Sequence, residues 1–231
     1  MLTVKGRIAL YGPLINFIVT VYCYLVGRSS GTFEQNGLIT FEKIVSVTPE
    51  VYVFIIATFV GGTVISDCSL RMYRIIRRRL QSVSNSDNYF IQLFASPQTQ
   101  LFCLVFWGSG SNLVLPLSMA FLVGPSHNHI WYYFCMSLYI IGAAIETIIV
   151  TLSLWIVHSR TKNDPTGSPT SMISLLAKSW IVTMYMLAVS AHLSSLLFSG
   201  NDESAGLSLY ITLATMWIMK GSYCLELNRE S

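Results

Sequence analysis

Long runs of apolar residues, separated by short polar segments, recur along the whole chain. A helix needs about 20 such residues to cross the hydrocarbon of a bilayer. The apolar residues come in runs and do not alternate with polar ones, as they would in a half-buried strand. The pattern therefore predicts an all-α, polytopic membrane helix bundle that forms a single domain over residues 1–231. The six predicted transmembrane helices cover residues 8–26, 51–66, 101–124, 131–157, 172–198 and 207–222.

Composition supports the membrane class and excludes others. Of the 231 residues, 53% are hydrophobic and only 11% are charged, against about 25% charged residues in soluble domains. The net charge of +3 is too small to indicate nucleic acid as a partner. Neither a glycine loop for phosphate nor a metal-ligand spacing occurs, so no cofactor and no metal are predicted.

Charges in the connecting segments predict the orientation of the bundle. The basic residues on one side are Lys5, Arg7, the five arginines of residues 71–79, Arg160, Lys162 and Arg229. The opposite side holds Glu34, Glu42, His127, His129, Asp202 and Glu203. Because Lys and Arg in short loops mark the cytoplasmic face, both termini are predicted to be cytosolic.

Glu146 and Lys178 fall inside predicted membrane helices and Asp67 directly follows another, in a region where an unpaired charge costs about 2.5–3.5 kcal/mol on insertion scales. Glu146 and Lys178 lie on consecutive helices about 8 Å apart in depth, a gap that two long side chains can close, so we expect them to form an ion pair. Asp67 precedes Arg71 by four residues, a spacing that allows a local pair on one helical face. A second interpretation makes Asp67 and Glu146 a proton path.

Histidines gather towards the predicted lumenal side. His192 lies near the lumenal end of the fifth predicted helix, and His127 and His129 lie in a lumenal turn. Histidine exchanges its proton most easily near neutral pH, so His192 and His129 are candidates for acid–base catalysis on a lipid carbonyl. The alternative is that these are ordinary histidines of a short polar turn with no catalytic role, since no serine or cysteine has an obvious nucleophile spacing to them.

Small and amide residues indicate close helix packing. Asn112, within "GSGSNL", is predicted to join neighbouring helices, with small residues permitting close approach. Gly61, Gly62 and the segment 142–144 are expected to do the same. The five cysteines fall mostly in or beside apolar segments, which favours a role as small apolar side chains.

Several segments resemble one family of six-span membrane proteins, which includes post-GPI-attachment-to-proteins factor 2 and the damage-regulated autophagy modulators. The segment "TPEVYVFIIATFVGGTVISDCSLRMYRI" resembles the family's second span, which carries Ser-x-x-Arg near its end; Cys68-Ser69-Leu70-Arg71 supplies a Ser and an Arg there, with one residue between them. The family's Asn, lumenal His and closing Trp correspond to Asn112, His129 and Trp155. "AVSAHLSS" and "SAGLSLYITLATMW" are similar to the histidine-bearing end of span five and to the opening of span six.

The resemblance implies lipid work in the membranes of the Golgi or the endoplasmic reticulum. Its closest pattern is the factor needed when a lyso-GPI anchor is reacylated, either as an acyltransferase or as an accessory subunit. Membrane lipids, GPI-anchored proteins and other GPI-remodelling enzymes would then be its partners. His129 or His192 would be the general base, and Asn112 or the pair Ser69 and Arg71 would bind polar groups of the substrate.

Two departures from the family pattern concern Ser69–Arg71 and Thr215. The proline often found before the family's Arg is missing, and Thr215 stands where the family usually carries Glu, which indicates a diverged or inactive relative if that Glu matters. Two other functions remain open: a non-enzymatic regulator resembling the autophagy modulators, and a small proton-coupled transporter.

Overall fold

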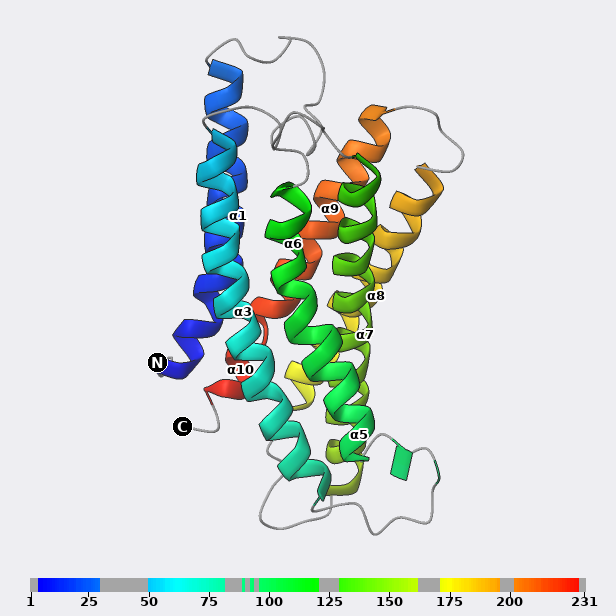
Figure 1. The fold of residues 1–231 in the computed structure, drawn as a ribbon. Coiled ribbons are helices and arrows are strands. Elements are labelled where there is room, and N and C mark those ends of the chain that lie inside the picture. Colours follow the sequence, from blue (N-terminus) through cyan, green and yellow to red (C-terminus); the bar gives the residue numbers. More distant parts are fainter. Residues whose placement is uncertain are drawn as a thin grey trace.

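The computed structural model describes residues 4–29, 50–81, 89, 92–93, 96–120, 129–161, 171–195 and 202–228. All regular elements within these residues are helices, and they pack side by side as a bundle (Figure 1). The all-α prediction is therefore confirmed for the described part of the chain. The elements are α1 (Val4–Ser29), α3 (Glu50–Gln81), α5 (Pro97–Gln100), the π-helix η1 (Leu101–Ser109), α6 (Gly110–Ala120), α7 (His129–Thr161), α8 (Met172–Ser194), α9 (Asp202–Gly221) and α10 (Cys224–Leu227).

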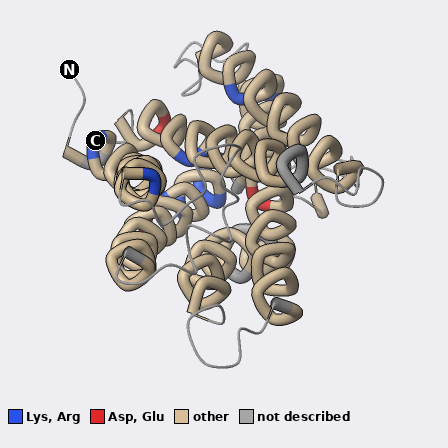
Figure 2. Tube along the Cα trace, turned by 90° about the horizontal axis from the view of Figure 1, so that it is seen from above, with Lys and Arg blue, Asp and Glu red and all other residues tan. Residues whose placement is uncertain are grey.

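Four of the described helices are long and apolar enough to cross a membrane; three contain predicted helices one, two and four, and the fourth, Met172–Ser194, covers predicted helix five as far as residue 194. Their exposed surfaces carry large apolar side chains, such as Ile173 at 79% and Trp180 at 69% exposure on α8. Water would make such a surface unfavourable, whereas lipid tails are as apolar as the side chains themselves. The protein is thus suited to a membrane, and Figure 2 shows few charged positions among its helices.

Helix α3 extends well past the predicted membrane segment 51–66. Its 32 residues correspond to about 48 Å of helix, more than the hydrocarbon thickness of about 30 Å. The arginines of its last turns separate by face: Arg74, Arg77 and Arg78 are exposed, whereas Arg79 is buried. A single basic run therefore supplies both a polar surface and one inward-facing cation.

The other two predicted transmembrane helices correspond to less regular elements. Helices η1 and α6 run on from Leu101 to Ala120, and the π-helical hydrogen bonding ends where Gly110 begins α6. Helix α9 covers most of the sixth predicted segment. Residues 121–124 and 196–198 lie outside the described part. Six spans and cytosolic termini remain predictions, although the two ends of the described part are close: a Cβ on Gly6 would lie 3.2 Å from the Cβ of Asn228.

Glycines allow several helix pairs to approach closely, as predicted for Gly61, Gly62 and Gly142. A Cβ on Gly62 of α3 would lie 2.5 Å from the carbonyl oxygen of Asn112 in α6. A Cβ on Gly142 of α7 would lie 2.5 Å from the Cβ of Ser111. These contacts involve backbone or short side chains, so even one methyl group would push the helices apart.

The buried apolar side chains form two clusters that follow each other along the bundle. One cluster contains Tyr139 and Ala143 of α7 and Trp217 of α9, and the other contains Val150 of α7 and Met219 of α9. On α7 the charged residue Glu146 falls at the boundary between the two clusters, and on α9 Lys220 directly follows Met219 of the second cluster. The core is therefore interrupted by charge inside the bundle.

We predict that Gly62→Ala destabilises the bundle and that Gly110→Ala does not. The new methyl group at position 62 would meet a backbone carbonyl, an overpacking that costs about 1–3 kcal/mol. No atom of the described residues lies within 4 Å of a Cβ on Gly110, so this matched change should be neutral or raise stability by up to about 1 kcal/mol through helix propensity. Thermal unfolding of both variants in one detergent measures this, and equal melting temperatures would contradict it.

Candidate functional site

A histidine–serine pair joins the last turn of α8 to the second turn of α9. The Nδ1 atom of His192 lies 3.0 Å from the Oγ atom of Ser208, within hydrogen-bonding distance. Both residues are 8% exposed. The two residues are separated by 16 positions in the sequence. Their contact was not predicted, because a nucleophile was expected only at a short spacing from histidine.

The geometry fits an activated nucleophile. In the tautomer that carries its ring proton on Nε2, His192 accepts the hydroxyl hydrogen of Ser208 at Nδ1. A serine hydroxyl is a weak nucleophile until such a base removes its proton. Burial keeps bulk water away, and water would compete for a covalent intermediate. The pair can therefore support acyl transfer.

His129, the other predicted catalytic histidine, is the first residue of α7, but the structure does not describe its side chain. His127 lies outside the described residues. In Figure 1 the first turn of α7, the end of α8 and the start of α9 lie at the same end of the bundle. The helix positions of His129 and His192 thus agree with the predicted gathering of histidines at one end of the bundle.

Glu146 forms a buried ion pair with Lys220, not with the predicted partner Lys178. Its Oε2 atom accepts a hydrogen bond from Lys220, and its Oε1 atom accepts one from Tyr223 at 3.1 Å. All three residues are at most 1% exposed. The carboxylate also packs against the backbone of η1, since a Cβ on Gly108 would lie 2.7 Å from its Cδ.

Lys178 belongs to a second buried cluster, built on the carboxylate of Glu226 in α10. Lys178 donates to Glu226 at 3.4 Å, Ser174 donates to it at 3.0 Å, and Arg79 of α3 donates to it at 3.0 Å. Burial raises the pKa of Glu226, but the charges of Lys178 and Arg79 and the hydrogen bonds outweigh this, so the pKa lies below its ordinary value. Helix α10 is thereby anchored inside the bundle.

The predicted local pair between Asp67 and Arg71 is confirmed. The Nε atom of Arg71 lies 2.7 Å from the Oδ2 atom of Asp67, and the side chains are 36% and 48% exposed, respectively. Asp67 is therefore a partly exposed shield for Arg71. This position gives no support to a buried proton path that starts at Asp67.

The three residues predicted to bind substrate do not form one site. Ser69 lies 19 residues beyond the start of α3, about 28 Å along the helix axis. It is therefore far from the end of the bundle that holds His192. Its buried hydroxyl has no hydrogen-bond partner within the part of the chain that the structure describes, and Arg71 is paired with Asp67. Asn112 is buried and donates to the carbonyl oxygen of Gly108 in its own helical segment. Its predicted role in packing is supported by the contact with Gly62, whereas a shared role with Ser69 and Arg71 is not.

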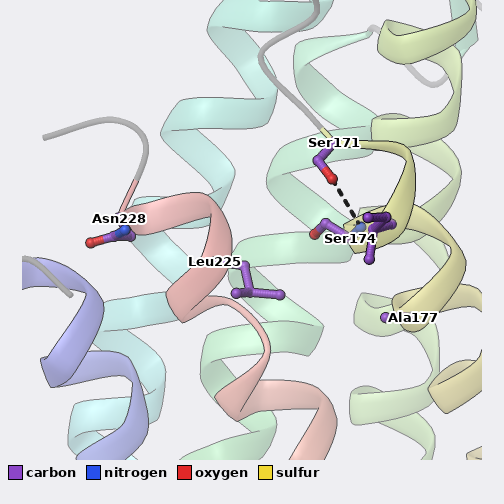
Figure 3. A pocket seen from close by; sticks show the side chains of 6 residues that line it. Ser171, Ser174, Ala177, Leu225 and Asn228 are labelled. Carbon is purple, nitrogen blue, oxygen red and sulfur yellow. Dashed lines mark hydrogen bonds between the residues drawn. The ribbon is translucent and has the colours of Figure 1, made fainter. Parts of the chain in front are cut away.

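A cavity of about 290 Å³ lies between the first turns of α8 and the helix α10. Figure 3 shows Ser171 and Ser174 on one side of it and Leu225 and Asn228 on the other. It adjoins the cluster of Glu226, at the opposite end of α8 from His192. No group of three metal-ligating side chains occurs among the described residues.

Comparisons with protein-family models, with curated proteins and with solved structures each found no match. The likeness to the GPI-remodelling and autophagy-modulator family is therefore a resemblance of short sequence segments.

We predict that Glu226→Gln lowers the free energy of unfolding by about 3–5 kcal/mol, the usual effect of removing one partner from a buried ion pair. The matched change Asp67→Asn breaks an exposed pair and should cost less than about 1 kcal/mol. Denaturation of both variants in detergent compares them, and similar losses would contradict the prediction.

The pH dependence of the free energy of unfolding should also differ between the wild type and Glu226→Gln. Because the pKa of Glu226 is lower in the folded state, the carboxylate stabilises the fold above about pH 4.3, the ordinary pKa of Glu. This contribution disappears as the pH falls through the lower folded pKa. Unfolding measured from pH 6 to pH 3 should show a steeper loss for the wild type than for Glu226→Gln, and parallel curves would contradict this.

Proposed function

We propose that the protein transfers fatty acyl chains between membrane lipids, as a GPI-anchor lipid remodelling factor of the secretory pathway. The observation that carries the proposal is the buried hydrogen bond between His192 and Ser208. The resemblance of "AVSAHLSS" and "SAGLSLYITLATMW" to the family concerns the same two helix segments. The proposal thus assigns one role to residues that two independent observations single out.

In this mechanism His192 is the general base and Ser208 is the nucleophile. The Oγ atom of Ser208 attacks the carbonyl carbon of a fatty ester while Nδ1 of His192 takes the hydroxyl proton. The ester bond to the donor breaks, and the proton passes to the leaving oxygen. A hydroxyl of lyso-GPI then attacks the acyl-serine, and His192 serves as base again.

The reaction would take place at the lumenal leaflet of the Golgi or the endoplasmic reticulum. GPI anchors reside on that side, and the loop charges predict that the ends of α8 and α9 near His192 face the lumen. His129, at the first turn of α7, would lie near the same surface. GPI-anchored proteins and other GPI-remodelling enzymes are the proposed partners.

A second candidate function, proton-coupled transport, is favoured by the cluster of Glu146, Lys220 and Tyr223. Buried ionisable residues in membrane helices often belong to proton relays. The cluster also touches the π-helix η1, and π-helical segments are frequent at functional sites. Unlike the acyl-transfer site, this cluster lies at the boundary of the two apolar cores.

The transport candidate predicts a proton leak that depends on Glu146. In proteoliposomes containing a pH-sensitive dye, an imposed pH gradient should collapse at least about tenfold faster with the wild type than with Glu146→Gln. Equal rates for both proteins and for empty vesicles would exclude this candidate. The Asp67→Asn variant is the matched control, because Asp67 lies on the partly exposed surface.

The acyl-transfer proposal predicts a defect in GPI lipids when His192 or Ser208 is changed. Cells lacking the protein should carry lyso-GPI or unsaturated chains on a GPI-anchored reporter, and mass spectrometry of the released lipid detects both. Wild type and Ser190→Ala should restore the lipid, since Ser190 is exposed on α8 and only bonds to its own helix. His192→Ala and Ser208→Ala should restore less than about a tenth, because general base catalysis contributes about 10²–10⁴-fold.

The amount and detergent stability of each variant must match the wild type, which separates chemistry from folding. If folded His192→Ala and Ser208→Ala rescue as well as the wild type, the pair is not catalytic and an accessory or regulatory role takes its place. If the reporter lipid is the same with and without the protein, GPI remodelling is excluded.

A further inference from the structure

The His192–Ser208 pair lies directly behind the lipid-facing surface of α8 and α9. Its sequence neighbours Leu193 and Leu207 are 53% and 51% exposed, and Ile211, one turn further along α9, is 49% exposed. On both helices, a buried polar side chain of the pair is thus directly next to an exposed leucine in the sequence. A molecule that reaches the pair along these leucines must itself be apolar along that side.

The depth of Ser208 matches the zone where fatty esters lie in a bilayer. Helix α9 begins at Asp202, next to Glu203, and these charged positions belong in the headgroup layer or in water. Ser208 is six residues further along, about 9 Å deeper. The polar layer on each side of the hydrocarbon is roughly 5–8 Å thick, so Ser208 comes to the boundary where acyl chains join their polar groups.

We propose that the acyl donor is a glycerophospholipid of the same bilayer, which reaches Ser208 sideways between α8 and α9. A water-soluble acyl thioester would have to bring a highly charged carrier to a pair that is bordered by lipid-facing leucines. A phospholipid already presents its ester at this depth, with its chains against Leu193 and Leu207. This inference rests on the proposed acyl transfer and adds the class of the donor.

The transfer step balances without a further reactant. The Oγ atom of Ser208 forms a bond to the ester carbonyl carbon, the bond from that carbon to the glycerol oxygen breaks, and the proton taken by His192 moves to the glycerol oxygen. The products are an acyl-serine and a lysophospholipid. Attack by a lyso-GPI hydroxyl returns the serine and completes the transfer.

The experiment offers both donors to the purified full chain in nanodiscs. One sample receives a phosphatidylcholine with an isotope-labelled acyl chain, and another receives the same chain as acyl-CoA. Mass spectrometry of the peptide containing Ser208, together with the lysophospholipid formed, reports the acyl-enzyme. We expect at least about tenfold more labelled Ser208 from the phospholipid, no label in Ser208→Ala, and normal label in Ser190→Ala.

The outcomes separate the donor from the function. Labelling by acyl-CoA without labelling by phospholipid would overturn the lipid donor and leave acyl transfer standing. No labelling of Ser208 from either donor, with lyso-GPI present or absent, would overturn the proposed catalysis and the donor with it.

A surface variant tests the sideways path without touching the pair. Leu193→Gln combined with Leu207→Gln places polar groups where the chains of the donor would lie, and should lower phospholipid-dependent labelling at least about fivefold. Leu187→Gln is the control, because Leu187 is also lipid-facing on α8 at 60% exposure but is more than one turn from His192. Equal labelling of the two variants would overturn the path between α8 and α9.

Discussion

Inside this bundle a charged side chain has no water to solvate it, and the fold depends on giving each buried charge a partner. Glu146 and Glu226 are almost completely buried, and each is met by cations from other helices. An uncompensated charge at either place would cost several kcal/mol. The pairing therefore requires residues 220–226 to turn inward after α9, and it brings the C-terminal segment against α3, α7 and α8.

Close packing and charge pairing depend on each other. The carboxylate of Glu146 fits between η1 and α7 because Gly108 has no side chain there. Similar close approaches at Gly62 and Gly142 hold α3 and α7 against the same η1–α6 segment. A larger residue at these positions would widen the bundle, and water would then reach the ion pair. Small residues thus keep the charges in the dry environment in which pairing is strongest.

Local interactions were predictable from the sequence, and interactions across the fold were not. The all-α class, the helical segments 8–26 and 131–157, and the pair Asp67–Arg71 follow from runs and spacings within one helix. The partner of Glu146 depends on how α9 docks, which depth along the helices alone could not determine. Lys220 was overlooked because it falls at the polar end of the last apolar run. Ser208 was overlooked for the same kind of reason, since its meeting with His192 needs a turn between two helices.

The distribution of polar groups along the bundle separates stability from chemistry. The Glu226 cluster and the cavity beside it lie at the end of the bundle where α8 begins, and they are densely linked by ionic hydrogen bonds. The His192–Ser208 contact lies at the end where α8 finishes, and an imidazole nitrogen and a hydroxyl oxygen make it. A strongly paired charge is a poor catalyst for ester chemistry, because its partner holds the proton in place. A histidine beside a hydroxyl places a side chain that can gain or lose a proton next to a potential nucleophile. The ionic cluster of Glu226 thus belongs to the end of the bundle where α8 begins, and the histidine–hydroxyl arrangement that acyl transfer needs belongs to the other end.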